Sequence, residues 1–352
     1  MCDLSVIMPI YNVAAFLDEA IEAILTEKTC SMEVILVDDG STDGCSFLVE
    51  KWKAKDPRVV TIHKKNGGAA SARNAGIAVA KGRYLYFPDA DDVVHAGYIK
   101  SMLMRMEEAG ADLLMTGYVV SYADGHSYRV KPKPAIYEGQ ASIREHMGAY
   151  LDNMILAVPW NKLYRADLIK ENGLSFPETD WDDLYFNLDV LEKAGRVLVE
   201  PLSGYRYRRM REGSSTQSIY EGKLFEKRKD QFEKIKASYQ SWGLYRKKEP
   251  LLYGYYAGRL IECIAYAQGE EDGGALLRRI LADPDTKRAF RIGRPVSFPL
   301  SLCRLFLRIS GHTGTAILGR FLFFMIKAHP KIVNSIKTRS VNGGVEEGTV
   351  HI

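Results

Sequence analysis

Three aspartates stand close together where a predicted strand ends. Asp89, Asp91 and Asp92 follow the run 83–88, which has the composition of a buried strand. Such a strand end concentrates negative charge at the carboxyl edge of a sheet, where open α/β folds bind their ligands. Carboxylate oxygens are hard ligands, so a divalent Mg²⁺ or Mn²⁺ that also holds a diphosphate would suit this position. The alternative is that these aspartates cap the next helix.

A second pair of carboxylates, Asp182 and Asp183, lies in the second half of the chain. Both residues precede the stretch 184–191, whose apolar residues have helical spacing. One interpretation is helix capping by Asp180 and Asp182. The other is general-base chemistry, because repulsion between adjacent carboxylates raises the pKa of one of them toward neutral pH.

Basic and aromatic side chains alternate in the stretch 205–211. Four arginines fall within the six residues 206–211. Beside a bound diphosphate, Arg209 and Arg211 could stabilise the charge of a leaving group, and the sequence does not separate the two. The stretch is equally consistent with a basic surface loop.

These groups must be positioned by a framework of alternating strands and helices. Such alternation predicts an α/β fold with a doubly wound, mostly parallel sheet and right-handed crossovers. Tyr11, Asp39 and the three aspartates would then surround one crevice at the carboxyl edge of the sheet. The predicted strands are Leu4–Met8, Glu33–Val37, Val59–His63 and Ala111–Tyr122, and the predicted helices are Ala14–Leu25, Phe47–Lys55, Ala69–Ala80 and Tyr98–Ala109.

Two common nucleotide-binding motifs are missing from this framework. The first turn reads Pro-Ile-Tyr-Asn instead of the GxGxxG of dinucleotide-binding folds, and no GK[ST] follows the glycine-rich stretch 66–70. A phosphate-binding helix start remains open at Gly67 and Gly68, with Arg73 and Asn74 in the next turn.

Four motifs in the first hundred residues carry a specific resemblance. SVIMPIYN (5–12), VDDGSTD (37–43), NGGAASARNAGI (66–77) and YLYFPDADD (84–92) resemble, in this order and spacing, the family 2 glycosyltransferases of the GT-A fold. The bacterial cell-surface polysaccharide type is the best match. The resemblance covers roughly residues 3–220.

The resemblance implies a nucleotide-sugar donor, usually a UDP-sugar. Pro9 and Tyr11 are expected to flank the base, and Asp39 to accept a hydrogen bond from the uracil imide. An aromatic face and an acceptor are what a flat pyrimidine with an imide N–H requires. Arg73 is expected near the base and Asp39, as a nucleotide-binding residue or as a structural partner of Asp39.

The resemblance also assigns the metal and the base. Asp91 is expected as the direct ligand of a divalent cation. Asp89, the other aspartate of the DxD pair, is expected on the ribose side. Asp183 is expected as the general base, and Asp182 stands where the family has Glu. Trp160 resembles a tryptophan on the acceptor side that stacks on a sugar ring, although a core tryptophan is the common alternative.

The C-terminal third is helical and partly basic. Helices are predicted at Lys223–Ser241 and Leu251–Gln268, followed by basic, apolar helices at 298–309 and 315–328 with a break at 311–314. We expect these last helices to lie on an anionic membrane surface, or alternatively to form a packing or homodimer interface. The predicted domains are 1–220 (catalytic), 221–337 (helical) and 338–352 (a disordered tail).

Composition limits the remaining possibilities. A net charge of +4 over 352 residues does not favour nucleic acid, and five scattered cysteines suggest neither zinc nor a disulfide framework. No signal-like segment opens the chain, which predicts a cytoplasmic protein, peripheral on the inner face of the plasma membrane.

The predicted function is metal-dependent, inverting sugar transfer to a hydroxyl of a glycan or lipid-linked glycan. The alternatives are a nucleotidyltransferase and a non-catalytic sugar-nucleotide or glycan-binding protein.

Overall fold

The chain forms two compact units. The computed structural model describes residues 2–28, 30–122, 124–209, 223–270, 272–294, 307, 311–328 and 345–347. The first unit comprises Met1–Arg211 with Glu346–Ile352, and the second comprises Glu212–Val345. The predicted boundary at residue 220 and most of the predicted tail lie outside the described residues.

An eight-stranded sheet forms the centre of the first unit. Parallel pairing joins β1 to β2 and β4, β2 to β3, and β6 to β11, whereas β10 runs antiparallel between β4 and β6, and β9 antiparallel beside β11. The predicted α/β class is therefore confirmed, with antiparallel strands that the sequence did not indicate. The order is β3 (Val59–His63), β2 (Met32–Asp38), β1 (Leu4–Ile10), β4 (Tyr84–Tyr86), β10 (Lys162–Arg165), β6 (Leu113–Thr116), β11 (Arg196–Glu200) and β9 (Ala135–Glu138).

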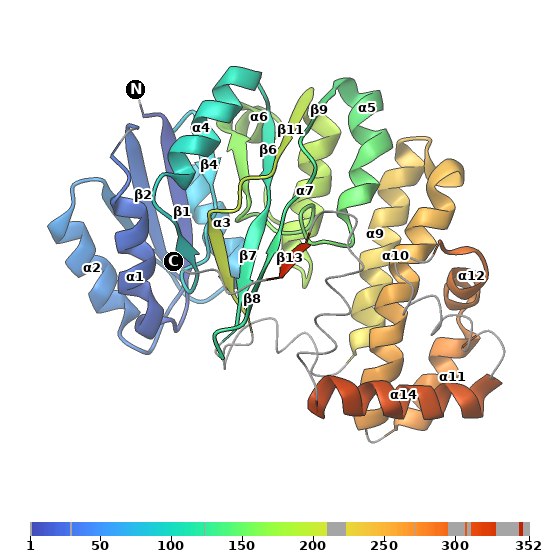
Figure 1. The fold of residues 1–352 in the computed structure, drawn as a ribbon. Coiled ribbons are helices and arrows are strands. Elements are labelled where there is room, and N and C mark those ends of the chain that lie inside the picture. Colours follow the sequence, from blue (N-terminus) through green and yellow to red (C-terminus); the bar gives the residue numbers. More distant parts are fainter. Residues whose placement is uncertain are drawn as a thin grey trace. The chain divides into compact units, whose positions relative to one another are not determined.

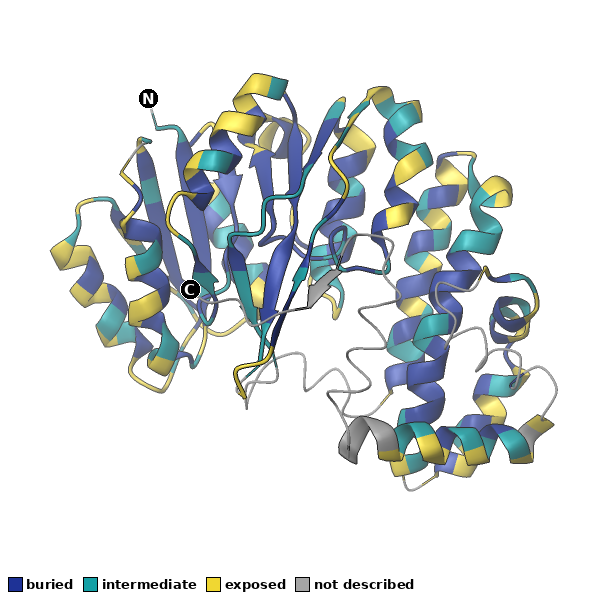
Figure 2. Ribbon diagram, in the orientation of Figure 1, coloured by how far each residue is buried: buried dark blue, intermediate teal, exposed yellow. Residues whose placement is uncertain are grey.

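Helices lie on both faces of this sheet (Figure 1). Its central strands are apolar on both sides, and Figure 2 shows them buried beneath helices whose outer faces are exposed. One helix, α3, packs especially closely, because a side chain at Gly76 would collide with Ile7 of β1. The helices of this unit are α1 (Ala14–Leu25), α2 (Cys45–Lys55), α3 (Gly68–Val79), α4 (Tyr98–Ala109), α5 (Gly139–His146), the 3₁₀ turn Met147–Tyr150, α6 (Ala166–Glu171) and α7 (Asp182–Lys193).

A second, five-stranded sheet supports the loop that carries the three aspartates. Its order is β13 (Val345–Glu347), β8 (Ser127–Val130), β7 (Tyr118–Ser121), β12 (Tyr205–Arg208) and β5 (Val93–Val94). The single strand predicted at Ala111–Tyr122 is wrong, because Gly117 divides it between the two sheets. A side chain at Gly117 would collide with the carbonyl oxygen of Val130, so only glycine permits this crossing.

The second unit is helical. Phe232 and Tyr256 stack with ring centroids 4.1 Å apart, and Arg228 forms a buried ion pair with Glu262 at 3.1 Å. Its helices are α9 (Leu224–Ser241), α10 (Tyr245–Tyr266), the 3₁₀ turn Ala267–Gly269, α11 (Gly273–Ala282), α12 (Pro284–Ile292) and α14 (Gly311–Ala328).

Two details of this unit differ from the prediction. α10 begins before Pro250, and α14 begins at Gly311, inside the predicted break, where the Thr315 hydroxyl donates to the Gly311 carbonyl at 2.6 Å. The predicted helix 298–309 lies, apart from Leu307, outside the described residues. Within the described ranges, none of the helices combines the length and apolar character that crossing a membrane requires.

Candidate active site

The first group of site residues follows the carboxyl ends of β1 and β2. Tyr11 comes directly after β1 and is 50% exposed, so its ring is accessible for stacking. Pro9 lies within β1, where it pairs with Val37 of β2. Their predicted roles at a nucleotide base stay predictions, and this geometry is compatible with them.

Asp39 is buried and fastens the start of α3. Its carboxylate accepts hydrogen bonds from the Lys64 ammonium at 2.5 Å, from Gly67 N–H at 3.1 Å and from Gly68 N–H at 2.7 Å. The carboxylate thus satisfies backbone donors at the helix start, as a side-chain cap does. The phosphate site left open at Gly67 and Gly68 is therefore not supported, because an anion from the protein already lies there.

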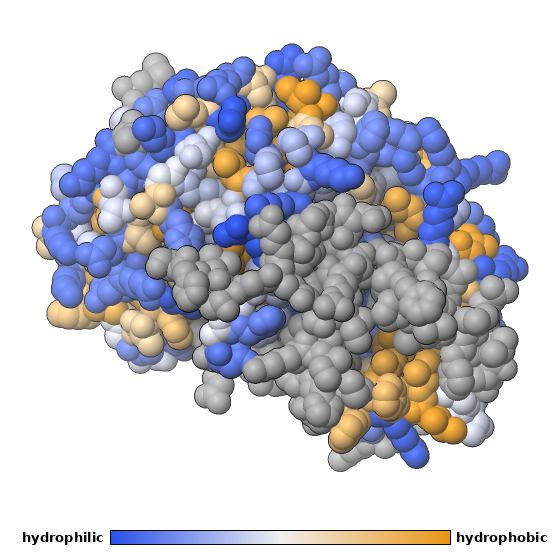
Figure 3. Space-filling model, in the orientation of Figure 1, coloured by the Kyte–Doolittle hydropathy of each residue, from blue (hydrophilic) through white to orange (hydrophobic). Residues whose placement is uncertain are grey.

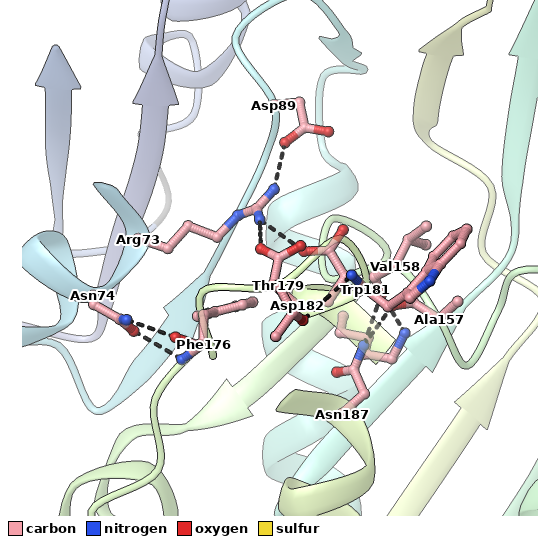
Figure 4. Close-up of polar contacts among 12 residues, drawn as sticks. Arg73, Asn74, Asp89, Ala157, Val158, Phe176, Thr179, Trp181, Asp182 and Asn187 are labelled. Atoms are coloured by element: carbon pink, nitrogen blue, oxygen red, sulfur yellow. Dashed lines mark hydrogen bonds and ion pairs between the residues drawn. The ribbon is translucent and has the colours of Figure 1, made fainter. Parts of the chain in front are cut away.

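Arg73 joins carboxylates from two distant parts of the chain. One terminal nitrogen of its guanidinium donates to Asp89 at 3.0 Å, and the other donates to Asp182 at 3.1 Å and Asp183 at 2.7 Å. Figure 4 shows the guanidinium between Asp89 and Asp182. The expected contact with Asp39 is not observed: the two terminal nitrogens of Arg73 donate to Asp89 and to the two carboxylates of α7, and the Lys64 ammonium pairs with Asp39 instead.

α7 presents Asp182 and Asp183 to this cation. Both belong to its first turn, where carboxylates are favourable, and no side-chain hydrogen bond caps this helix. The loop before α7 is held against α3, because the Asn74 side chain exchanges two 2.8 Å hydrogen bonds with the backbone of Phe176. Helix capping therefore does not explain the pair.

The cluster carries more negative than positive charge. Burial raises the pKa of Asp89 to about 6, against the opposing effect of Arg73. Burial also raises the pKa of Asp182, and that of Asp183 well above its ordinary value. A raised pKa makes a carboxylate a stronger base, which favours its use as a general base.

The loop 89–92 is held by β12. The Tyr205 hydroxyl donates to Asp92 at 2.7 Å and accepts from the Asp89 N–H at 3.1 Å, and the Arg208 N–H donates to Asp92 at 2.8 Å. Asp92 is 3% exposed, and burial raises its pKa well above the ordinary value. The next helix begins only at Tyr98, so these aspartates do not cap it.

The aspartates of this loop fit a divalent cation whose remaining ligands come from the substrate. Within the described ranges, no three His, Cys, Asp or Glu side chains converge on a common metal position. Mg²⁺, however, is commonly held by one or two carboxylates together with substrate phosphates. Asp89 and the half-buried Asp91 can supply such a pair, and the excess negative charge of their surroundings favours a cation.

Trp160 does not present a face to a ligand. It is 2% exposed, and its indole stacks on Tyr205 with centroids 4.4 Å apart and lies against Tyr207 and Tyr118. The expected acceptor-side stacking is therefore corrected: Trp160 is a core residue that supports β12.

Of the two remaining predicted residues, Arg209 directly follows β12. The Arg209 N–H donates to the Ser121 carbonyl at 2.9 Å, which extends the pairing of β12 with β7. Arg211 lies outside the described residues. The leaving-group roles of both arginines stay predictions.

Sequence reasoning missed three residues that organise the site. Lys64 pairs with Asp39, and Tyr205 bridges the aspartate loop. Lys162 is fully buried, donates to Asn161 at 2.9 Å and to the Ile155 carbonyl at 2.5 Å, and has a pKa that burial lowers well below its ordinary value. The available signals were a lysine before the glycine pair and a lysine in the apolar segment 158–164.

Known proteins resemble this chain over most of its length. A family model for glycosyl transferase family 2 matches residues 5–173. The uncharacterized glycosyltransferase EpsJ of Bacillus subtilis is 31% identical over 250 residues, which covers 68% of this chain and 70% of EpsJ. The succinoglycan biosynthesis protein ExoO of Rhizobium meliloti is 31% identical over 227 residues, covering 60% of this chain and 62% of ExoO.

A solved structure shares the fold. The crystal structure of Staphylococcus aureus TarS residues 1–349 superposes with a TM-score of 0.61 at 19% identity, covering 90% of each chain. The same TarS segment in complex with UDP-GlcNAc gives a TM-score of 0.54 at 21% identity, covering 82% of this chain and 89% of TarS. The predicted GT-A architecture is confirmed by this likeness together with the observed sheet. The chain therefore belongs to glycosyl transferase family 2, and it is a glycosyltransferase.

Proposed function

We propose that this glycosyltransferase moves a sugar from a UDP-sugar to a hydroxyl of a glycan or lipid-linked glycan, with inversion, in cell-surface polysaccharide synthesis. The observation that carries the proposal is the Arg73 cluster. One guanidinium holds Asp89, beside the candidate metal ligand Asp91, and also Asp182 and Asp183. This arrangement supports the proposal, because the residues that we assign to the donor diphosphate and to the acceptor hydroxyl contact the same guanidinium.

The choice of donor and pathway draws support from relatives. TarS forms complexes with UDP-GlcNAc and with UDP. ExoO is named for succinoglycan biosynthesis, and GgaB of Bacillus subtilis for minor teichoic acid biosynthesis. The exposed ring of Tyr11, at the carboxyl edge of β1, is suited to a nucleotide base.

Asp183 acts as the base in the proposed reaction. Its carboxylate takes the acceptor proton while the acceptor oxygen attacks the anomeric carbon, and the bond from that carbon to the diphosphate oxygen breaks on the opposite side. A single displacement of this kind inverts the anomeric configuration. Arg209 and Arg211 stabilise the departing diphosphate. A divalent cation held by Asp91 and Asp89 would neutralise part of the same charge.

The decisive experiment compares conservative variants of the two α7 carboxylates. Asp183→Asn keeps the shape and loses the basicity, so transfer should fall by about 10² to 10⁴-fold with nearly unchanged UDP-sugar affinity. Asp167→Asn, which changes an exposed carboxylate of α6, is the matched control. If Asp182→Asn abolished transfer and Asp183→Asn did not, the base would be Asp182.

The products separate the competing functions. UDP release with transfer of the sugar supports the proposal, whereas release of pyrophosphate identifies a nucleotidyltransferase. Tight UDP binding without turnover, including slow hydrolysis of the donor, identifies a non-catalytic binding protein. Full activity of Asp91→Ala in EDTA would exclude the cation.

The proposal also places the enzyme at the inner face of the plasma membrane through α14. Ile317, Phe321 and Phe324 are 62%, 58% and 59% exposed and share one face of this helix, since they are spaced i, i+4, i+7. Figure 3 shows hydrophobic surface gathered over this end of the helical unit. Exposed apolar side chains of this kind mark interaction surfaces.

Vesicle binding tests this placement. Changing the three α14 residues together to serine should abolish sedimentation with phosphatidylglycerol vesicles at low salt. Phe47→Ser is the matched control, because Phe47 is 74% exposed but lies on α2. A dimer that the triple variant dissociates, without any vesicle binding by the parent protein, would identify α14 as a homodimer interface.

A further inference from the structure

The helical unit contains a hollow between α11, α12 and α14. Its volume is about 600 Å³, which lies within the range of small-molecule sites. Leu281, Phe290 and Leu307 supply apolar lining, and Gly311 and Thr315 line it from the start of α14. This side of α14 differs from the exposed face that carries Ile317, Phe321 and Phe324, because Thr315 and Ile317 point about 200° apart around the helix.

Three cations line the same hollow. Arg278, Lys287 and Arg291 belong to its lining and are exposed, and no acidic residue lines it within the described ranges. The aspartates nearest in the chain are engaged elsewhere. Asp283 pairs with Lys229, and Asp285 pairs with Lys236 at 2.9 Å. The hollow therefore presents the positive charges of Arg278 and Lys287 beside an apolar interior.

A buried hydroxyl in the lining lacks a partner. Thr286 is 1% exposed, and its Oγ1 has no hydrogen-bond partner among the described residues. Its backbone N–H is satisfied by the Asp283 carboxylate at 3.0 Å, so only the side chain is unpaired. A buried polar group without a partner is costly, and a ligand that accepts its hydrogen bond would remove this cost.

We propose that this hollow binds an amphiphile with a phosphate headgroup and an alkyl chain. Arg278, Lys287 and the Thr286 hydroxyl would donate hydrogen bonds to the phosphate oxygens, and the apolar lining would contact the first part of the alkyl chain. Two sources share this chemistry, a free alkyl phosphate and a phosphate-bearing lipid of a bilayer. The inference concerns the second unit alone and does not rest on the proposed reaction.

Calorimetry on the full-length protein tests the proposal with monomeric dodecyl phosphate. Inorganic phosphate supplies the headgroup alone, and dodecyl maltoside supplies the chain alone. Dodecyl phosphate should bind at least tenfold more tightly than either. The variant Arg278→Gln/Lys287→Gln should weaken that binding at least tenfold, and Thr286→Val about fivefold. Arg246→Gln, an exposed cation of α10 outside the lining, should leave it unchanged.

Two outcomes would overturn the proposal. One is equal affinity of the parent protein and the double variant for dodecyl phosphate, with melting temperatures showing that both are folded. The other is equal binding of dodecyl maltoside. Phosphatidic acid vesicles distinguish the two sources. Weaker vesicle binding by the double variant assigns the site to a bilayer lipid, and unchanged vesicle binding with weaker dodecyl phosphate binding assigns it to a free alkyl phosphate.

Discussion

Replacing Arg73 by methionine removes the cation that three carboxylates share. The side chain of Arg73 is 5% exposed, and those of Asp89, Asp182 and Asp183 are 29%, 18% and 30% exposed. Methionine retains much of the volume against the Phe176 ring, 5.2 Å from the guanidinium carbon. The variant therefore tests the charge more than the packing.

The expected loss is large because the carboxylates stay behind. Removing one partner of a buried ion pair costs about 3 to 5 kcal/mol. For a unit of this size, such a loss lowers the melting temperature by roughly 6 to 20 °C.

The loss should also depend on pH. In the folded protein the pKa of Asp89 is raised from 3.8 to about 6, and that of Asp183 lies well above its ordinary value. Carboxyls with raised pKa values favour folding when protonated, so their stability is fully present below about 4 and is lost as the pH rises through the raised values. Arg73 limits this loss of stability, because its positive charge favours the ionised carboxylates. The difference in unfolding free energy between parent and variant should therefore be larger at pH 8 than at pH 5.

Urea denaturation, followed by tryptophan fluorescence at both pH values, measures this difference. Arg83→Met is the control, because Arg83 also pairs with two carboxylates, Asp3 and Glu107, but is 46% exposed. It should change stability by about 1 kcal/mol or less. Equal urea midpoints for Arg73→Met and the parent protein at pH 8 would refute the reasoning.

Three further variants test the supports of the site. Asp39→Ala should lower the unfolding free energy by about 1.5 to 3 kcal/mol in the absence of nucleotide, since the Lys64 ammonium and the start of α3 lose their acceptor; an unchanged melting temperature with weaker UDP binding would limit Asp39 to the nucleotide. Tyr205→Phe should cost about 1 to 3 kcal/mol by urea denaturation, because Asp92 loses its donor, and equal midpoints would contradict this. His63, whose pKa is raised mainly by a hydrogen bond to Glu50, contributes stability that is present below about 6.5 and lost as the pH rises through the raised value. The difference between the parent protein and His63→Gln should thus be larger at pH 5.5 than at pH 9, and a pH-independent difference would contradict it.

Local sequence signals predicted the framework well. The bounds predicted for Ala14–Leu25, Val59–His63 and Tyr98–Ala109 agree with the structure. Apolar periodicity and flanking turn residues depend on neighbours in the chain, so the sequence expresses them directly. The failure at Gly117 has a different origin, because the break there depends on a carbonyl of another strand.

The sequence identified candidate site residues one by one but not how they are arranged. Arg73 contacts carboxylates 109 and 110 positions away, and nothing near Arg73 in the chain indicates which of several aspartates it meets. Trp160 illustrates a second limit, since the sequence does not reveal that Tyr205 covers its indole. Motifs identify the side chains, whereas their partners depend on long-range packing.

The position of β10 between β4 and β6 also determines when the two halves of the main sheet can be joined during synthesis. β4, at Tyr84–Tyr86, gains this neighbour only after residue 165 has been made. Arg73 gains two of its carboxylates only after residue 183. A fragment ending at residue 173, where the family match stops, would contain a buried arginine with Asp89 alone. The shortest fragment that folds independently is therefore expected to reach Arg208, whose N–H secures the aspartate loop.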